Sequence, residues 1–106
     1  MAVIKEKSSL TVTLIFKDEK KNPIVPTLVT YQIDDVESGT QIKEPTDIVP
    51  TSSSYDLEIA WSDNALLSQN NFSETRRITV SFVYGATGKK GNGEFKYLIK
   101  NLVKVV

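Results

Sequence analysis

Apolar and polar residues alternate along several stretches of this chain, which is the pattern of β-strands that bury one face and expose the other. The longest alternation is Thr75–Gly85, where the apolar residues Ile78, Val80, Phe82 and Tyr84 fall on every second position. The stretch is also rich in β-branched and aromatic residues, which suit a pleated, half-buried surface. It therefore predicts a central strand whose buried face defines the core.

The same period of two predicts further strands along the chain. They cover Ser9–Lys17, Thr27–Val36, Thr40–Lys43, Tyr55–Trp61 and Glu94–Asn101. Residues 1–7 are predicted to form an edge strand or a flexible arm, because Val3 and Ile4 precede a run of charges. Lysines at a sheet edge are a common guard against unwanted pairing.

Turn-forming residues separate the predicted strands. Two prolines and a run of serine and threonine make Glu44–Ser54 a predicted loop, with a β-bridge at Ile48–Val49 as an option. Ala65–Leu67 is expected to form a short helix capped by Ser62 or Asp63. Gly85–Gly93 has four glycines in nine residues and is predicted to be a hairpin loop.

Six to seven short strands separated by turn signals predict an all-β sandwich or barrel. No stretch predicts a helix long enough for a parallel crossover, so the strands should be antiparallel. Two stacked sheets with alternating faces would enclose one core about 10 Å thick. The chain has 106 residues, which fits a single domain over residues 1–106.

The composition limits the chemistry that the chain can perform. It contains no cysteine and no histidine. Cysteine is needed for a disulfide framework or a sulfur-based zinc site, and histidine is the usual general base near neutral pH. We therefore expect no enzymatic activity, no cofactor and no metal site.

The net charge and the hydropathy of the chain limit the kinds of partner that it is expected to bind. Lys and Arg number 13, Asp and Glu number 13, and the net charge is zero. Nucleic-acid binders normally carry a basic excess, so binding to nucleic acid is not expected. No apolar run approaches the roughly 20 residues that span a bilayer, and the charges in MAVIKEKSS leave no apolar core for a signal peptide. These features predict a soluble protein made in the cytosol, without a membrane partner.

The order of the strands resembles that of immunoglobulin-like and fibronectin type III-like modules. SLTVTLIFKDEKKNPIVP followed by TLVTYQIDD resembles a B strand, a B–C turn and a C strand. YDLEIAWSDNALL resembles an E strand that runs into a helical turn, and ITVSFVYG with EFKYLIKNL resembles an F–G hairpin. The resemblance implies an immunoglobulin-like antiparallel β-sandwich of about seven strands with one short helical turn. The cysteine pair of antibody domains is absent and Trp61 lies on the E-like strand, which favours a bacterial or phage version.

The stretch IDDVESGT (residues 33–40) and the block SDNALL…ETRRITVSFVYG are similar in style to small immunoglobulin-like proteins of tailed bacteriophages. This resemblance implies a place in the virion, as a capsid decoration, connector or tail accessory protein made in the host cytoplasm. The implied partner is a major capsid or tail protein, and a homo-oligomer is a further option.

Protein–protein contact is the function that the residues themselves favour. Apolar residues that interrupt the polar faces of strands, Ile15 among them, and an apolar C-terminal tail suggest a strip beyond the core. Val83 is expected to face towards Leu98. The glycine-rich hairpin loop can approach another backbone closely. The candidate contact residues are Lys89, Lys90, Asn92, Val83, Leu98, Leu102, Val103, Val105 and Val106.

Two charged groups have alternative interpretations. Asp34, Asp35 and Glu37 either form a calcium site or mark a solvated strand end, and the second interpretation is favoured because the spacing of an EF-hand loop is missing. Arg76 and Arg77 point to opposite faces of a strand. Arg76 should turn inward and pair with an acid at the rim of the sandwich, while Arg77 faces solvent or a contact.

The aromatic residues could form a platform for sugars, but their alternation favours core packing. They are Trp61, Tyr55, Tyr31, Phe82, Tyr84, Phe95 and Tyr97. The sequence therefore predicts a non-enzymatic structural or interaction protein. The alternative is a module that binds carbohydrate or a receptor on a host surface.

Overall fold

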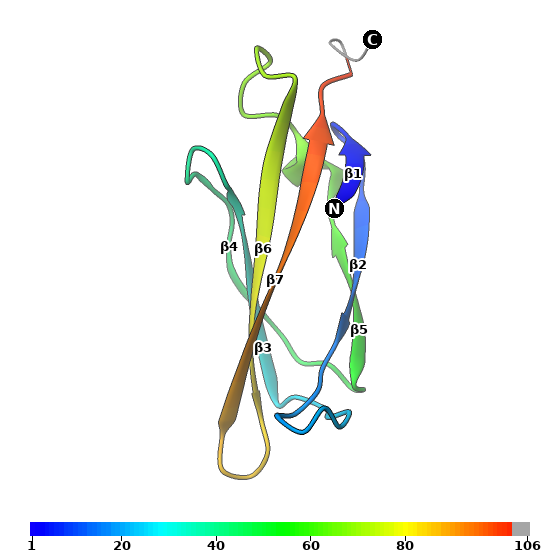
Figure 1. The fold of residues 1–106 in the computed structure, drawn as a ribbon, viewed down its shortest axis with the longest axis vertical. Helices are drawn as coiled ribbons and strands as arrows, with labels where there is room; N and C mark the ends of the chain where they lie inside the picture. The colour runs from blue at the N-terminus through cyan, green and yellow to red at the C-terminus, as the bar shows by residue number, and fades with distance from the viewer. Residues whose placement is uncertain (103–106) are drawn as a thin grey trace.

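The computed structural model describes residues 1–102, which form seven strands and one 3-10 helix. The elements are β1 (Ala2–Lys5), β2 (Leu10–Ile15), β3 (Leu28–Asp35), β4 (Gln41–Ile48), β5 (Ser54–Ile59), η1 (Trp61–Asn64), β6 (Ser73–Tyr84) and β7 (Lys89–Lys100). They build an elongated body of 50 × 21 × 21 Å, with the N-terminus in the half away from the β6–β7 turn (Figure 1). The all-β prediction is confirmed.

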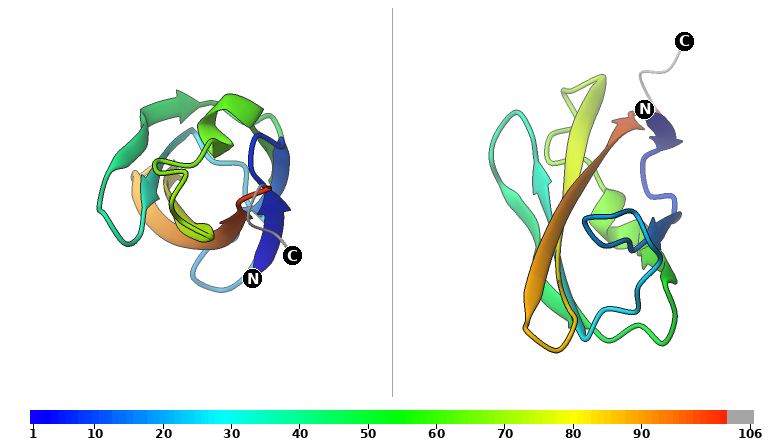
Figure 2. Two further views of the ribbon diagram at one scale, coloured as in Figure 1. Left: turned by 90° about the horizontal axis from the view of Figure 1, so that it is seen from above. Right: turned by 60° about the horizontal axis from the view of Figure 1, so that its bottom comes forward.

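The strands form two sheets that face each other across one core (Figure 2). The larger sheet has the order β1-β7-β6-β3-β4, and the smaller sheet pairs β2 with β5. β6 is the middle strand of the larger sheet and pairs along its whole length with β7, from Ser73↔Lys100 to Tyr84↔Lys89. The predicted central strand is therefore central in the structure.

The expectation of purely antiparallel pairing is wrong at one edge of the larger sheet. β1 pairs with β7 in parallel, from Ala2↔Tyr97 to Lys5↔Lys100. The crossover rule concerns parallel strands that follow each other in the chain. β1 and β7 lie at opposite ends of the described chain, so the five strands between them form the connection and no long helix is needed.

The predicted loop Glu44–Ser54 is also partly wrong, because β4 extends to Ile48. β4 is an edge strand of the larger sheet, where a proline is tolerated. Its register against β3 shifts between Tyr31↔Thr46 and Ile33↔Lys43, so an irregularity surrounds Pro45. Pairing with β3 therefore outweighs the local tendency of proline to end the strand.

The core lies between the sheets and contains the apolar faces that the alternation predicts. Its buried members are Val12, Phe16, Val29, Tyr31, Ile33, Leu57, Ile59, Leu66, Ile78, Val80, Tyr97 and Ile99. The expectation for Trp61 is wrong, since its side chain is 59% exposed. β5 ends at Ile59 and η1 starts at Trp61, so Trp61 no longer follows the alternation of the strand. η1 also replaces the short helix expected at Ala65–Leu67.

A buried polar cluster closes the core near η1. Arg76 is fully buried and donates from Nη1 to Asp35 Oδ1 (3.0 Å) and from Nη2 to Glu74 Oε1 (2.9 Å). Nη2 also donates to the carbonyl oxygen of Ala65 (2.9 Å). The prediction that Arg76 turns inward and pairs with an acid is confirmed, and it pairs with two.

Candidate functional site

One edge of the larger sheet is open along most of β7. β1 pairs with Tyr97–Lys100 and leaves Lys89–Lys96 without a neighbouring strand on that side among residues 1–102. We call Lys89–Lys96 the open β7 edge. An unpaired strand edge presents free backbone N–H and C=O groups and is a template for pairing with another chain.

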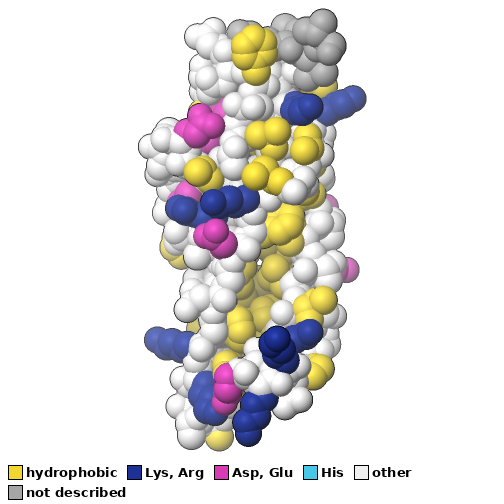
Figure 3. Space-filling model, in the orientation of Figure 1, with side chains coloured by type: hydrophobic (Ala, Val, Ile, Leu, Met, Phe, Trp, Pro, Cys, Tyr) yellow, Lys and Arg dark blue, Asp and Glu magenta, His cyan; other side chains and the backbone are white. Residues whose placement is uncertain are grey.

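An apolar cleft lies beneath the open β7 edge, between β7 and the free side of β2. It has a volume of about 400 Å³, and we call it the edge cleft. Figure 3 shows hydrophobic side chains on the floor of a hollow near the middle of this face. Its lining residues are Val12, Thr13, Leu14, Ile15, Phe16, Lys17, Val80, Phe82, Asn92, Gly93, Glu94 and Phe95.

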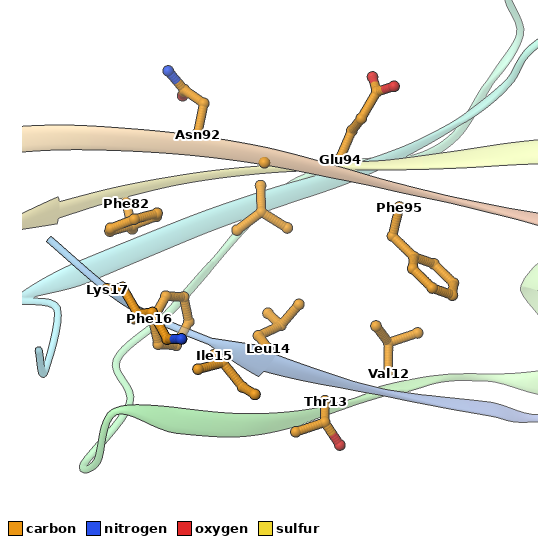
Figure 4. Close-up of a pocket in the computed structure, with 12 residues that line it drawn as sticks. Val12, Thr13, Leu14, Ile15, Phe16, Lys17, Phe82, Asn92, Glu94 and Phe95 are labelled. Carbon is orange, nitrogen blue, oxygen red and sulfur yellow. The ribbon is translucent and has the colours of Figure 1, made fainter. Parts of the chain in front are cut away.

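Some side chains around the edge cleft point into it, and others point away from it. Val12 and Leu14 of β2 point towards β7, and Phe95 points down from β7 between the strands (Figure 4). Asn92 and Glu94 point away on the outer face of the larger sheet (Figure 4). The cleft is therefore apolar inside and polar along its upper rim.

Two glycines keep the edge cleft open. The inward-facing positions of β7 alternate with the outward ones, and Gly91 and Gly93 occupy two successive inward positions opposite Phe82 and Val80. A Cβ at Gly91 would lie 2.8 Å from both ε carbons of the Phe82 ring, whereas a Cβ at Gly93 meets no atom within 4 Å. Phe82 thus packs over Gly91, and the space at Gly93 stays empty.

Replacing Gly91 with alanine is expected to lower the free energy of unfolding by about 1 to 3 kcal/mol, since the Phe82 ring must shift and its packing against Phe16 is disturbed. Gly93→Ala is the matched control, two residues away on the same face. Neither glycine has a positive φ, so the control should leave the stability unchanged or raise it by up to about 1 kcal/mol. Urea denaturation measures both, and equal effects would contradict the packing argument.

A polar cluster ties the tip of the β6–β7 hairpin to the connection between β2 and β3. Glu19 accepts hydrogen bonds from Lys89 Nζ (2.7 Å) and from the Tyr84 hydroxyl (2.6 Å). The hydrogen bond from Lys89, followed by that from Tyr84, lowers the pKa of Glu19 to about 2. The same hydrogen bond from Tyr84 raises the pKa of that phenol above its ordinary value. The cluster holds in place the end of the open β7 edge that adjoins the hairpin turn.

We expect wild type to lose its stability advantage over Glu19→Gln in acid. The folded-state pKa of Glu19 is depressed, so its contribution is present above the ordinary value of 4.5 and is lost as pH falls through about 2. Urea midpoints of both proteins between about pH 7 and pH 2 measure the difference. A difference that stays constant over this range would show that Glu19 does not hold the hairpin tip electrostatically.

The predicted contact residues fall into separate places. The hairpin loop is shorter than expected, and Lys89, Lys90 and Asn92 belong to β7. β7 continues through them because every residue from Lys89 to Lys100 has a partner on β6. All three therefore lie on the open β7 edge.

The apolar strip is not continuous. Val83 lies opposite Lys90 and Leu98 lies opposite Thr75, so the expectation that Val83 faces Leu98 is wrong. Ile15 belongs to the smaller sheet and is 65% exposed. Leu102 is exposed at the far end of β7. Val103, Val105 and Val106 lie outside the described residues.

The predicted acidic cluster of Asp34, Asp35 and Glu37 does not form one site in the structure. Asp35 is buried and accepts hydrogen bonds from Arg76 and from the backbone and hydroxyl of Ser38. The interpretation as a solvated strand end is therefore wrong for Asp35. Asp34 lies opposite Arg77 on the neighbouring strand. Within residues 1–102, no group of three potential metal ligands comes together.

Comparison of the chain with protein-family models, curated proteins and solved structures finds no match. No helix within the described part has the length and hydropathy needed to cross a bilayer. The open β7 edge and the edge cleft are therefore known from the structure of this chain and from no related protein.

Sequence reasoning missed the edge cleft, although one signal was present. The inward positions of β7 read Lys89, Gly91, Gly93 and Phe95, so the alternation loses its side chains for two steps. Two glycines on the core face of a strand leave space beneath it.

Proposed function

We propose that this protein is a non-enzymatic structural module that acts by binding other proteins. The open β7 edge above the edge cleft is the observation that carries the proposal. It combines free backbone groups with apolar side chains that an added strand would cover. Backbone pairing supplies affinity in such a contact, and the cleft selects the side chains that enter it.

We further propose an immunoglobulin-like sandwich. The pairing of β2 with β5 corresponds to the B and E strands of that fold, and the run β7-β6-β3-β4 corresponds to G, F, C and C′. β1 then takes the place of an N-terminal strand beside G. The agreement of this order with the sequence resemblance supports the assignment.

The proposed setting is the virion of a tailed bacteriophage, where the protein would decorate or stabilise the capsid or join tail parts. This setting rests on the sequence resemblance, whereas the protein-binding role rests on the open β7 edge. Repeated copies on one particle would raise the avidity of each weak contact. The partner in the particle would be a major capsid or tail protein.

Mass spectrometry of purified intact particles tests the setting. We expect the protein in many copies per particle, at a constant ratio to the capsid protein across the fractions of a density gradient. If it stays in the lysate and is missing from intact particles, the virion role is wrong.

A surface-binding adhesion module is the second candidate, and exposed aromatic side chains favour it. Trp61 is 59% exposed and Phe72 is 71% exposed, and both lie in the connection between β5 and β6. Exposed aromatic rings are suited to stacking against sugars. Binding on a glycan array that Trp61→Ala abolishes would support this candidate, and an array without signal would remove it.

A further inference from the structure

The backbone groups of the open β7 edge point outward at every second residue. Glu6 N donates to the carbonyl oxygen of Lys100 (2.8 Å), so the backbone groups of Lys100 point towards β1. Alternate residues of a strand point the same way, and the register with β6 runs without a shift from Lys100 to Lys89. Free N–H and C=O groups therefore face outward at Lys90, Asn92 and Glu94, whereas the carbonyl oxygen of Lys96 faces Ala2 at the start of the parallel ladder with β1.

A second copy of the chain can pair with this edge about a two-fold axis. An antiparallel pairing must bring outward-facing residues of one copy opposite outward-facing residues of the other. The axis then passes through one residue of β7, and each choice of residue gives one register. The charges along the edge distinguish these registers.

Of the five registers centred on residues 90 to 94, three oppose like charges. A pairing centred on Lys90 puts two lysines opposite each other, and one centred on Glu94 puts two glutamates opposite each other. A pairing centred on Gly93 opposes Lys90 to Lys96 of the second copy. Like charges directly opposite one another destabilise a strand pair.

Two registers pair opposite charges, but the one centred on Phe95, which opposes Glu94 to Lys96, would place Asn92 of the second copy opposite Leu98, where β1 already pairs. The other register avoids this conflict. Centred on Asn92, it opposes Lys90 to Glu94 of the second copy, and the symmetry makes this contact twice. Both side chains lie on the outer face and are exposed, at the close spacing of directly opposed residues in a strand pair. A pairing centred on Gly91 opposes Lys90 to Asn92 and therefore forms neither of the two Lys90–Glu94 ion pairs.

The length of the open edge fits the same register. With Asn92 on the axis, Lys96 lies opposite Gly88 of the second copy, which belongs to the four-residue turn between β6 and β7. The next residue of β7, Tyr97, already has Ala2 as its partner. The hairpin of the second copy thus ends where β1 begins.

The inner face also suits a second copy. In this register Gly91 lies opposite Gly93 of the second copy, so no side chain fills the inner face at the junction. The two edge clefts then meet beneath the paired strands. Apolar side chains such as Leu14 and Phe95 would lose contact with water, which favours association.

We infer that the open β7 edge is a two-fold self-association surface, with Asn92 on the axis and Lys90 paired with Glu94 of the second copy. The five-stranded sheets of two copies join into one continuous sheet. The inference rests on the proposed protein-binding role of this edge but needs no particle. Failure of self-association and absence from particles are therefore separate results.

Analytical ultracentrifugation of the purified full chain over a wide concentration range tests the inference. We expect wild type to be a dimer, and Lys90→Glu or Glu94→Lys alone to weaken the dimer at least about tenfold. An equimolar mixture of the two variants should restore it, because residues 90 and 94 are then complementary in both contacts. Lys43→Glu, on β4 at the other edge of the same sheet, is the control and should change nothing.

Amide hydrogen exchange supplies an independent measurement. The outward N–H groups of Lys90, Asn92 and Glu94 should exchange more slowly as the protein concentration rises, while those on β4 should not change. A chain that is monomeric at every concentration overturns the inference. A dimer that survives both single charge reversals, or that the mixture does not restore, also overturns it.

Discussion

Replacing Arg76 with methionine is expected to lower the free energy of unfolding by about 3 to 5 kcal/mol. Arg76 is fully buried and is paired with Asp35 and Glu74, which are themselves buried. Methionine keeps much of the volume but leaves two carboxylates in the interior without their cation. An uncompensated buried charge costs far more than an exposed pair gains. Urea denaturation near neutral pH measures the loss.

Arg77→Met is the matched control, because Arg77 is the next residue and points to the outer face. It should change the stability by no more than about 1 kcal/mol. Combining Arg76→Met with Asp35→Asn and Glu74→Gln removes the unpaired charges and should recover part of the loss. A loss below about 1 kcal/mol for Arg76→Met would show that the carboxylates do not need the arginine.

The hydrogen bonds around this cluster explain why it can be buried at all. Glu74 accepts from the backbone N–H groups of Leu67 and Ser68, and Asp35 accepts from Ser38. Among the described residues, Arg76 Nε is the one buried side-chain nitrogen or oxygen without a hydrogen-bond partner. The cluster therefore fixes the β5–β6 connection against the end of the core.

The sequence predicted the inward direction of Arg76 and could have predicted Glu74, which is two residues away on the same face of β6. It could not predict Asp35, because that contact depends on the register between β3 and β6. The face that a residue occupies depends only on its position along its own strand, so it is a local property. Register between strands depends on how the whole sheet assembles.

The same distinction holds for the strands. The alternation identified β2, β3, β5 and β6, whose buried faces are apolar and regular. It failed for the second half of β4 and the first half of β7, where Pro45 and the glycines weaken the local signal. There the structure is fixed by a neighbouring strand, which a local pattern does not contain.

The candidate site was the least predictable part. Lys90 and Asn92 were selected as members of a loop, and their importance here comes from a strand edge that β1 leaves uncovered. The edge cleft depends on the distance between two sheets and on empty inward positions at Gly91 and Gly93. Only the glycines are visible in the sequence, and their meaning depends on knowing which face of β7 they occupy.

Alkaline pH is expected to destabilise the protein through Tyr97. The Tyr97 side chain is fully buried, and burial raises its pKa from 10.0 to about 12. The folded state keeps the phenol neutral up to about pH 12, whereas the unfolded state ionises it above about pH 10. The contribution of Tyr97 is therefore complete below pH 10 and falls between pH 10 and pH 12. Since one pKa unit corresponds to about 1.4 kcal/mol, the loss should reach about 2 to 3 kcal/mol.

Tyr97→Phe isolates this effect, because subtracting its stability from that of wild type cancels every other titrating group. Near pH 8 the variant should be less stable by about 1 kcal/mol, since it loses the hydrogen bond from the Tyr97 hydroxyl to Asn64 Oδ1 (2.8 Å). Towards pH 12 the order should reverse, because phenylalanine has no proton to lose. Urea denaturation at about pH 8, 10 and 11.5 measures the two curves. If they stay parallel across this range, Tyr97 is not kept neutral by burial in the folded state.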